Sequence, residues 1–570
     1  MNQWLIMAPS EGGHLPEQFP FERDRYTRLD CGSVRAWFRR DDRFSNDQLF
    51  AADGRGLAVC DGVVLNLAEL KKEYGAENFS EVLCRSWKDT EGVFFKKFAG
   101  PFCGAVYDRE TNTLTAYANQ TGDTFVFYYH SGSFYFVSND LNMIEAVMRE
   151  NGLPRSLDET AARYLLSFGF MIDERTLFQE IKRVLPGEMV RFPASGGYER
   201  SVYHRFSFEP RSISFAGAIE LVDEGFRKAV KRCVEKDIEY GIQEHLADLS
   251  GGLDSRMTAW VARDMGYGPL VFLNYCSSRS DEVSCASRVA ATVGGQFFHK
   301  QLDDVSFLYE VDRLVDMNYG LAIYAGITGG EQFLRSLNFQ RFGLEYTGQV
   351  GDAVIGSLLK DPQVTLQDMQ RRIKESRTLA IDSPVELTDR FGSTEAFAMY
   401  TRAFLGALCS HIIRRHYTYA VSPFIDPDFF ALCMSIPLEY RMEHKLYRAW
   451  MKAKYPQALA LPSTTLRNGP ARAAFFFHRA WHRGIRILWT AGLLKRVPRP
   501  DPTNMNPFDN WYMAKPELRD FIERYYQETH GLLDRYHGLG ADVDRMYASS
   551  RSVDKLLMLS LLAAVKRYFP

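Results

Sequence analysis

The stretch Ser250-Gly251-Gly252-Leu253-Asp254-Ser255 decides the fold, because the pattern of the chain changes from strand to helix across it. The apolar run before it, residues 246–249, is long enough for a buried strand that ends at the glycines. After it, apolar residues recur at helical spacing from 257 to 265, and Gly266 stands where a left-handed glycine would stop a helix. A second apolar run, residues 270–275, predicts the next strand. The six residues are therefore expected at the strand-to-helix junction of a βαβ unit.

A junction of this composition is suited to binding an anion. Free backbone N–H groups and the positive end of the helix favour negative charge, and Gly251 and Gly252 let the backbone approach a ligand closely. Asp254 adds a carboxylate for Mg²⁺, which a cluster of phosphate charge requires. We therefore expect the loop to hold a pyrophosphate and its metal ion, with ATP cut between its α- and β-phosphates. The flanking pattern disfavours the alternative, an ordinary turn rich in Gly and Ser.

Two other kinds of nucleotide-binding motif are missing from the sequence. Neither a Gly-x-x-x-x-Gly-Lys-Ser/Thr segment nor the spaced glycines of a dinucleotide fold follows a predicted strand. An enzyme that transfers a γ-phosphate from a P-loop is therefore disfavoured.

Length and composition describe a large folded protein without the charge that nucleic acid requires. At 570 residues the chain is long for one core, so two or more domains are expected. Hydrophobic residues make up 46% of the chain and charged residues 25%, which is ordinary for a folded soluble protein. The 69 basic and 71 acidic residues leave a net charge of -2, so no nucleic-acid partner is expected.

The cysteines and the two terminal apolar segments predict a cytoplasmic protein that does not span a membrane. The nine cysteines are scattered, with no Cys-x-x-Cys pair and no His-rich segment for a zinc site, which favours a reduced cytoplasmic protein. Residues 1–8 lack the basic leader and long apolar core of a secretory signal and predict a first strand. Residues 556–565 are about half as long as a bilayer span requires and predict a buried helix.

The chain divides into two unequal parts. Up to about residue 205 it is rich in short aromatic and β-branched runs separated by turn residues, which predicts a layered β-rich domain. Beyond that point a helical pattern over 215–234 precedes the βαβ unit, and the chain is mostly helical after about residue 360. We therefore expect one domain at 1–205 and a second at 206–570.

Six further segments are informative through their order and spacing. In the first part these are residues 61–66 (DGVVLN), 98–108 and 185–187, and in the second they are 280–286, 347–352 (TGQVGD) and 422–427 (SPFIDP). Together with the glycine-rich loop they resemble the asparagine synthetase family, in which a glutaminase-type domain precedes an adenylating domain. The matching family segments include Asn-Gly-Glu-Ile-Tyr-Asn, Ser-Gly-Glu-Gly-x-Asp and Val-Pro-Phe-Leu-Asp-Pro. The resemblance spans nearly the whole chain.

The resemblance implies an α/β protein that uses ATP and Mg²⁺. It implies a layered αββα-type (Ntn-like) first domain and an adenine-nucleotide α-hydrolase-like second domain with a parallel sheet and many helices. The expected metal ligands are Asp254 and Asp352. The expected ATP-binding residues are Ser250, Gly251, Gly252, Asp254, Ser255, Thr347 and Gly348.

The glutaminase half departs from the family at its nucleophile. The family uses a Cys at position 2, and this chain has Asn2. An amide side chain cannot become a thiolate, so no glutamyl thioester can form there. Cys31 superficially resembles the missing Cys-Gly start, but residues 1–8 already supply the first strand, so we expect a packed structural cysteine. The first domain is therefore expected to be a scaffold without glutaminase activity.

The adenylating half departs from the family where the second reaction step is served. The Glu of Ser-Gly-Glu-Gly is Gln349 here, which cannot accept a proton from an attacking ammonium. The family's Glu-x-Arg before Val-Pro-Phe is Tyr419-Ala420-Val421. No lysine stands near 467–470, where one would stabilise the charged transition state, so Arg467 or Lys445 is the candidate catalytic cation.

Two charged positions near the loop have more than one interpretation. Arg256, directly after the loop, could add a cation beside the pyrophosphate or lie on a solvated helix face. Asp281 and Glu282 match an Asp-Glu pair of the family. They also fit the acidic first turn of a helix, which needs no catalytic role and is the interpretation that we favour.

These observations predict an ATP-dependent amide-forming ligase of the asparagine synthase type. It would activate a small-molecule or peptide carboxylate as an acyl-AMP, release pyrophosphate and transfer the acyl group to an amine or ammonia. Two alternatives stay open. One is a peptide macrocyclase of the lasso type, a group that also lacks the nucleophilic Cys. The other is a non-catalytic nucleotide-binding paralogue, which the joint departures at Gln349, Tyr419, Val421, Pro470 and Ala353, where the family has Glu, favour. A homo-oligomer also stays open, and no membrane partner is expected.

Overall fold

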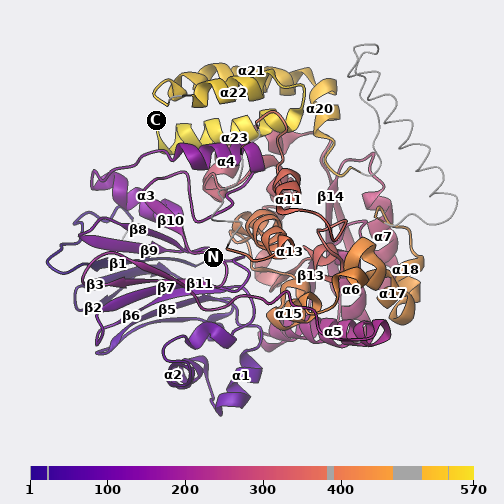
Figure 1. The fold of residues 1–570 in the computed structure, drawn as a ribbon, viewed down its shortest axis with the longest axis horizontal. Helices are drawn as coiled ribbons and strands as arrows, with labels where there is room; N and C mark the ends of the chain where they lie inside the picture. Colours follow the sequence, from indigo (N-terminus) through magenta and orange to yellow (C-terminus); the bar gives the residue numbers. More distant parts are fainter. Residues whose placement is uncertain (1, 22–24, 380, 382–389, 466–503, 537) are drawn as a thin grey trace.

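Two antiparallel six-stranded sheets form the first part of the chain, as its short aromatic and β-branched runs predict (Figure 1). The computed structural model describes residues 2–21, 25–379, 381, 390–465, 504–536 and 538–570. The first sheet, in the order β10-β8-β9-β1-β3-β2, contains β1 (Gln3–Pro9), β2 (Thr27–Cys31), β3 (Val34–Arg39), β8 (Phe127–His130), β9 (Phe134–Ser138) and β10 (Ile181–Arg183). The second, in the order β12-β11-β7-β6-β5-β4, contains β4 (Leu49–Ala52), β5 (Gly56–Gly62), β6 (Phe102–Asp108), β7 (Thr113–Ala118), β11 (Glu188–Pro193) and β12 (Glu199–Val202).

Helices lie on the outer faces of the two sheets, which gives the expected αββα layers. α3 (Leu141–Glu150) packs on β1, β8 and β9, while α1 (Leu67–Tyr74) and α2 (Phe79–Asp89) lie below the second sheet (Figure 1). Strand β1 shows why both of its faces are apolar. Its alternate residues Trp4 and Ile6 pack between the sheets, whereas Leu5 and Met7 pack under the helical layer.

A five-stranded parallel sheet forms the centre of the second part, as predicted. Its order is β15-β14-β13-β16-β17, with β13 (His245–Asp248), β14 (Leu270–Cys276), β15 (Gln296–Gln301), β16 (Glu345–Tyr346) and β17 (Ala420–Val421). The helices α5 (Phe215–Glu239), α6 (Asp254–Asp264) and α7 (Glu282–Val293) pack beside it (Figure 1). The predicted strand–loop–helix–strand order is confirmed, and Gly266 ends α6 with φ +85°.

The C-terminal helix joins the two parts through one continuous hydrophobic core. α23 (Ser552–Tyr568) is buried along most of its length, which confirms the helix predicted at 556–565. It packs against α4 (Glu159–Phe168), α8 (Val311–Asn318), α21 (Pro516–Thr529) and α22 (Leu539–Ala548). The same core reaches the first sheet of the N-terminal part. The predicted domain boundary near 205 lies in the connection between β12 and α5.

One further helical stretch has the length and apolar character of a membrane span. Residues Thr394–Arg414 have a mean hydropathy of 1.3, and 83% of this stretch is buried inside the protein. It includes α13 (Thr394–Ala398) and α14 (Ser410–Arg414) with a π-helical segment, Met399–Gly406, between them. Burial of this extent is typical of a core helix, and the lack of a membrane partner stays a prediction.

Candidate functional site

The glycine-rich loop lies at the carboxyl end of β13, where α6 begins. β14 stands on one side of β13 and β16 on the other, so the chain crosses over in opposite directions at this point of the sheet. Ligands bind in such crevices outside the carboxyl ends of parallel strands. A cavity of about 380 Å³ opens here. Its wall includes Asp248, Ser250, Gly252, Asp254, Ser255, Tyr275, Glu282, Thr347, Gly348, Gln349, Asp352, His444, Tyr447, Thr464 and Thr465.

Hydroxyl groups hold the loop in shape while the start of α6 faces the cavity. Ser255 Oγ accepts the Ser250 N–H at 2.9 Å and lies 2.9 Å from Ser250 Oγ, which in turn accepts the Gly252 N–H at 3.2 Å. The N-cap residue Leu253 makes no side-chain hydrogen bond to the first turn of α6. The N–H groups at the positive end of the helix are therefore available to an anion.

The segment 347–352 packs directly against this helix start. A Cβ on Gly348 would lie 2.1 Å from the Ser255 backbone nitrogen, and one on Gly351 would lie 2.7 Å from the Asp254 Cγ, so only glycine fits at either position. Between them Val350 has φ +58°, a conformation that a β-branched residue seldom adopts. The structure thus brings Thr347, Gly348 and Asp352 to the loop, as the resemblance implies.

Two carboxylates, Asp254 and Asp352, meet at the mouth of the loop. The Asp352 N–H donates to Asp254 Oδ2 at 3.0 Å. Burial raises the pKa of the Asp254 carboxyl well above its ordinary value, and the negative charge of Asp352 raises it further. Neither carboxylate has an ion-pair partner among the residues that the structure describes. Mg²⁺ bound through one or two carboxylates plus substrate phosphates fits this pair, because a cation would offset the repulsion.

Glu282 reaches further into the loop than an acidic first-turn residue would. It begins α7, as we expect, but its side chain is buried and its carboxylate accepts the Gly251 N–H and the Thr464 hydroxyl, the latter at 2.8 Å. Thr464 also donates its N–H to the Gly251 carbonyl at 3.0 Å. Glu282 therefore ties the loop to the segment after α18 (Pro456–Ala460), a role that the first-turn interpretation missed.

Arg256 meets neither of the two expectations for it. It is fully buried on α6, so it lies on no solvated face, and it is not part of the cavity wall. Its guanidinium donates to the carbonyls of Ala458 at 2.9 Å, Leu461 at 3.1 Å and Pro462 at 2.5 Å. It therefore fixes the chain that carries Thr464 to the loop.

Lys445, one of the two candidate catalytic cations, is not part of the cavity wall. Lys445 begins α17 (Lys445–Lys454) and is exposed, whereas its neighbours His444 and Tyr447 line the cavity. Arg467 lies outside the residues that the structure describes. His444 has φ +58°, and burial lowers the pKa of its imidazole. Sequence reasoning missed His444 and Tyr447, because only their approach to residues 254 and 352 in space marks them.

A buried ionic network stands behind the inner wall of the cavity. Arg414 at the end of α14 donates to Asp248 Oδ2 at 2.6 Å and to the Tyr275 hydroxyl at 2.7 Å, and it also binds Glu345 Oε1. Asp248 and Tyr275 belong to the cavity wall, and Glu345 lies behind them on β16. The one signal for this network in the sequence is Asp248, a charged residue at the end of an otherwise apolar strand.

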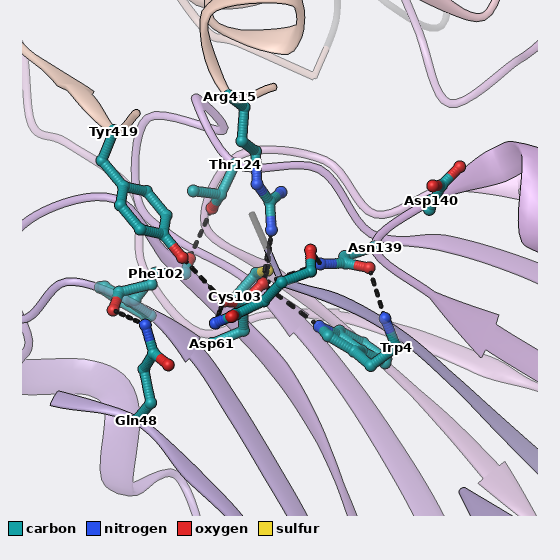
Figure 2. Close-up of polar contacts among 12 residues, drawn as sticks. Trp4, Gln48, Asp61, Phe102, Cys103, Thr124, Asn139, Asp140, Arg415 and Tyr419 are labelled. Carbon is teal, nitrogen blue, oxygen red and sulfur yellow. Dashed lines mark hydrogen bonds and ion pairs between the residues drawn. The ribbon is translucent and has the colours of Figure 1, made fainter. Parts of the chain in front are cut away.

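A second buried polar centre lies in the N-terminal part, around Asp61 at the end of β5. Figure 2 shows Arg415 and Tyr419 reaching toward Asp61 from the second part of the chain. Asp61 accepts from Arg415 Nη2 at 2.5 Å, Tyr419 OH at 2.9 Å, Asn139 Nδ2 at 2.8 Å, Asn2 Nδ2 at 2.8 Å and Trp4 Nε1 at 3.3 Å. The side chain of Asp61 is fully buried. Its carboxylate is thus saturated with donors from both parts of the chain.

The cysteines around this centre are not poised as nucleophiles. Cys103 Sγ lies 4.0 Å from Asp61 Oδ2, and burial raises the pKa of the Cys103 and Cys60 thiols to about 12. Cys31 is buried at the end of β2, which confirms it as a packed cysteine. Asn2 is buried as well, and its Oδ1 accepts the Asp41 N–H at 2.6 Å.

Comparison with known proteins identifies two domain types in the chain. Residues 41–204 match the glutamine amidotransferase domain, and residues 221–405 match asparagine synthase. Among solved structures, glutamine phosphoribosylpyrophosphate amidotransferase from B. subtilis, complexed with ADP and GMP, is 12% identical with a TM-score of 0.23. A structure of the allosteric regulatory enzyme of purine biosynthesis is 13% identical with a TM-score of 0.23. Each match covers 52% of this chain and 59%, less than two thirds, of the other.

No curated protein sequence matches the chain significantly. The chain nevertheless carries a glutamine amidotransferase domain followed by an asparagine synthase domain. The asparagine synthase domain is the basis of the activity proposed below.

Proposed function

We propose that this protein activates a carboxylate as an acyl-AMP, with release of pyrophosphate, and then transfers the acyl group to an amine or ammonia. The observation that carries the proposal is the junction of β13 and α6. The uncapped helix start there carries Asp254, whose carboxylate lies beside Asp352. The helix start suits the pyrophosphate, and the carboxylates suit Mg²⁺. This arrangement serves cleavage between the α- and β-phosphates of ATP.

The proposed reaction has two steps, adenylation and acyl transfer. In the first, an oxygen of the substrate carboxylate attacks the α-phosphorus, and the bond from that phosphorus to the β-phosphate breaks. The N–H groups at the start of α6 hold the departing pyrophosphate, and Mg²⁺, when bound, offsets its charge. In the second, an amine nitrogen attacks the acyl carbon and AMP leaves.

We propose further that the N-terminal domain does not hydrolyse glutamine. Asn2 stands beside Asp61, and the nearby Cys60 and Cys103 thiols are held protonated by burial. The donors around Asp61 are used by that carboxylate and are not free to hold a substrate. Incubation with glutamine should release no glutamate above background, and robust release would overturn this part of the proposal.

The conditions under which the protein works are part of the same proposal. We propose a cytoplasmic enzyme that takes a small-molecule or peptide carboxylate and an amine, without a nucleic-acid or membrane partner, either alone or as a homo-oligomer. The net charge of -2 and the nine free cysteines support this setting.

Exchange of labelled pyrophosphate into ATP tests the adenylation step. We expect exchange that depends on one of a broad panel of acids, peptides included, and that is lost in Asp254→Ala. Asp264→Asn, at the far end of α6, is the matched control and should keep exchange. A panel without any exchange would contradict adenylation. Tight nucleotide binding without exchange would instead favour the non-catalytic paralogue.

A further inference from the structure

Two residues of the inner cavity wall have a buried side-chain oxygen that lacks a hydrogen-bond partner among the described residues. Asp248 Oδ1 and Gln349 Oε1 are both buried and unpartnered among the described residues, and both side chains belong to the cavity wall. Gln349 is held in this orientation because its Nε2 donates to Ser410 Oγ at 2.5 Å. Buried polar atoms in native proteins normally have partners, so this pair of acceptors indicates a ligand that brings donors.

The charges behind this wall are also unbalanced. Among the residues that the structure describes, Arg414 is the one cation that binds Asp248 and Glu345, so two carboxylates face a single positive charge. Glu345 is fully buried, and its Oε2 has no hydrogen-bond donor among the described residues. Burial raises the pKa of the Glu345 carboxyl to about 7, and the charge and hydrogen bond of Asp248 also raise it, against the opposing effect of Arg414. When both carboxylates are ionised, the network lacks one positive charge.

A protonated amine supplies both missing features. An ammonium group carries one positive charge and up to three N–H donors, which match the two free oxygens on the wall. A phosphate or carboxylate would add to the excess of negative charge, and an apolar group would leave the oxygens unpartnered. The cavity wall includes Asp248, Tyr275 and Gln349, and Arg414 connects Asp248 and Tyr275 to Glu345 behind the wall.

We propose that the Asp248–Gln349 end of the cavity is a binding subsite for a protonated amine. The inference rests on the proposed function, because it assigns a place in the same cavity to a reactant of the ligase. The ammonium has two chemical sources: the attacking amine, or an amino group carried by the carboxylate substrate itself. The subsite chemistry is the same for both, and the experiment below separates them.

For an attacking amine the subsite also has a place for the proton that must leave. One proton passes from the ammonium to the Asp248–Glu345 pair, and the nitrogen lone pair then forms the bond to the acyl carbon. The bond from that carbon to the AMP oxygen breaks with its electron pair on the phosphate, and the second amine proton leaves to water. The pair would thus accept the amine proton, which Gln349 cannot accept because its amide is not basic.

Calorimetry on the full chain with ATP and Mg²⁺ tests the subsite without knowledge of the substrate. Methylammonium is the probe, and tetramethylammonium, which has the same charge and no N–H donor, is its control. We expect methylammonium to bind at least tenfold more tightly than tetramethylammonium, and Asp248→Asn to abolish that preference. Equal binding of the two cations, or an unchanged preference in Asp248→Asn, would overturn the proposal. Asp264→Asn should bind like the wild type.

A second variant keeps the test decisive if Asp248→Asn fails to fold. Gln349→Met has a similar volume and removes the free amide oxygen without touching Arg414. We expect it to weaken methylammonium binding at least threefold, and unaltered binding in a folded Gln349→Met would count against the subsite.

Kinetics with an acid that supports pyrophosphate exchange then separates the two sources of the ammonium. If the subsite holds the attacking amine, Asp248→Asn keeps exchange and loses amide formation with methylamine. If it holds the substrate's own amino group, Asp248→Asn raises the KM of an amino acid in exchange and leaves that of its deamino analogue unchanged. No change in either assay would overturn the proposal. If the wild type shows no exchange at all, the proposed function fails, whereas the calorimetric result still decides the subsite.

Discussion

The two buried carboxylate centres of this protein differ in how completely their oxygens are partnered. Asp61 in the N-terminal part accepts from five nitrogen and hydroxyl donors of the described residues. Asp248 and Glu345 in the second part share one arginine, and each keeps an oxygen without a described partner. Removing a saturated buried carboxylate is costly because its partners lose their acceptor, whereas an unpartnered buried oxygen already costs folding energy that a ligand donor would offset. With the proposed subsite, the first centre is structural and the second binds a ligand.

Consecutive residues connect the two centres. Arg415 binds Asp61 of the N-terminal domain, and Arg414 binds the network at the cavity. Both lie at the end of α14. The same turn of the chain therefore contacts the N-terminal domain through Arg415 and the cavity network through Arg414, in two separate ion pairs.

The largest expected effect is at Asp254, which lines the same cavity as Asp248. Asp254→Asn removes a proposed metal ligand, and we expect pyrophosphate exchange to fall roughly 10⁴-fold, about 5 kcal/mol of transition-state stabilisation. The variant should unfold in urea at the same or a higher concentration than the wild type, because the repulsion from Asp352 is relieved. Exchange near the wild-type rate, with Asp264→Asn as control, would show that this carboxylate pair is not catalytic.

The opposite pattern, a loss of stability without a loss of exchange, is expected at Asp61. Asp61→Ala leaves the Arg415 guanidinium buried without its carboxylate, so we expect the free energy of unfolding to fall by about 3–5 kcal/mol. Urea denaturation measures the loss, and exchange by the folded fraction should stay near the wild-type level. Asp30→Asn, an exposed carboxylate of the same domain, should change stability by less than about 0.5 kcal/mol. A stable but inactive Asp61→Ala would reverse the assignment of the two centres.

The third prediction concerns how the unsaturated network depends on pH. The folded-state pKa of Glu345 is raised to about 7, so its contribution to stability is present below about 4.5 and is lost as the pH rises through 7. Glu345→Gln removes this dependence. Between pH 5 and pH 8 the free energy of unfolding of this variant should rise by on the order of 2–3 kcal/mol relative to that of the wild type.

Urea denaturation of both proteins across this pH range measures the difference. A constant difference at all pH values would mean that the pair takes up no proton and cannot accept one from an amine.

Sequence predicted the parts of the molecule that depend on neighbours along the chain. The apolar run before Ser250, the helical spacing after it and the stop at Gly266 are local signals, so β13, the loop and α6 follow from them. The buried C-terminal helix follows from the apolar run at 556–565 for the same reason. The alternating strands of the first domain gave its layers but not its order, because strand order depends on contacts between distant segments.

Residues that meet only in the folded chain could not be predicted in this way. Arg414 lies 166 positions from Asp248 and 69 from Glu345, and Tyr419 lies 358 from Asp61. Parallel strands bring such residues to one edge of a sheet, whereas nothing in the local sequence marks Arg414 or Glu345 as partners of Asp248. Arg256 shows the same limit: its three carbonyl partners lie more than 200 positions away, so neither local interpretation could be right.

Glu282 is partnered, as Asp61 is, but it lines the cavity, as Asp248 does, and the smallest expected effect is there. Its carboxylate is partnered by Gly251 and Thr464, yet it occupies an N–H of the loop that we propose for pyrophosphate. Glu282→Gln keeps the size of the side chain and removes its charge. The unfolding free energy should fall by about 1 kcal/mol, because a charge-assisted hydrogen bond becomes a neutral one. Pyrophosphate should bind more tightly, by less than about tenfold, because one negative charge beside it is gone.

The KM of pyrophosphate in the exchange assay, together with urea denaturation, distinguishes the two roles of Glu282. A lower KM with a small loss of stability places Glu282 in competition with the anion for the loop. A higher KM with the same loss would mean that its charge is needed to hold the loop open for the anion, which would move Glu282 to the structural side of the comparison. Asp264→Asn lies on a neighbouring helix and should leave the KM of pyrophosphate unchanged.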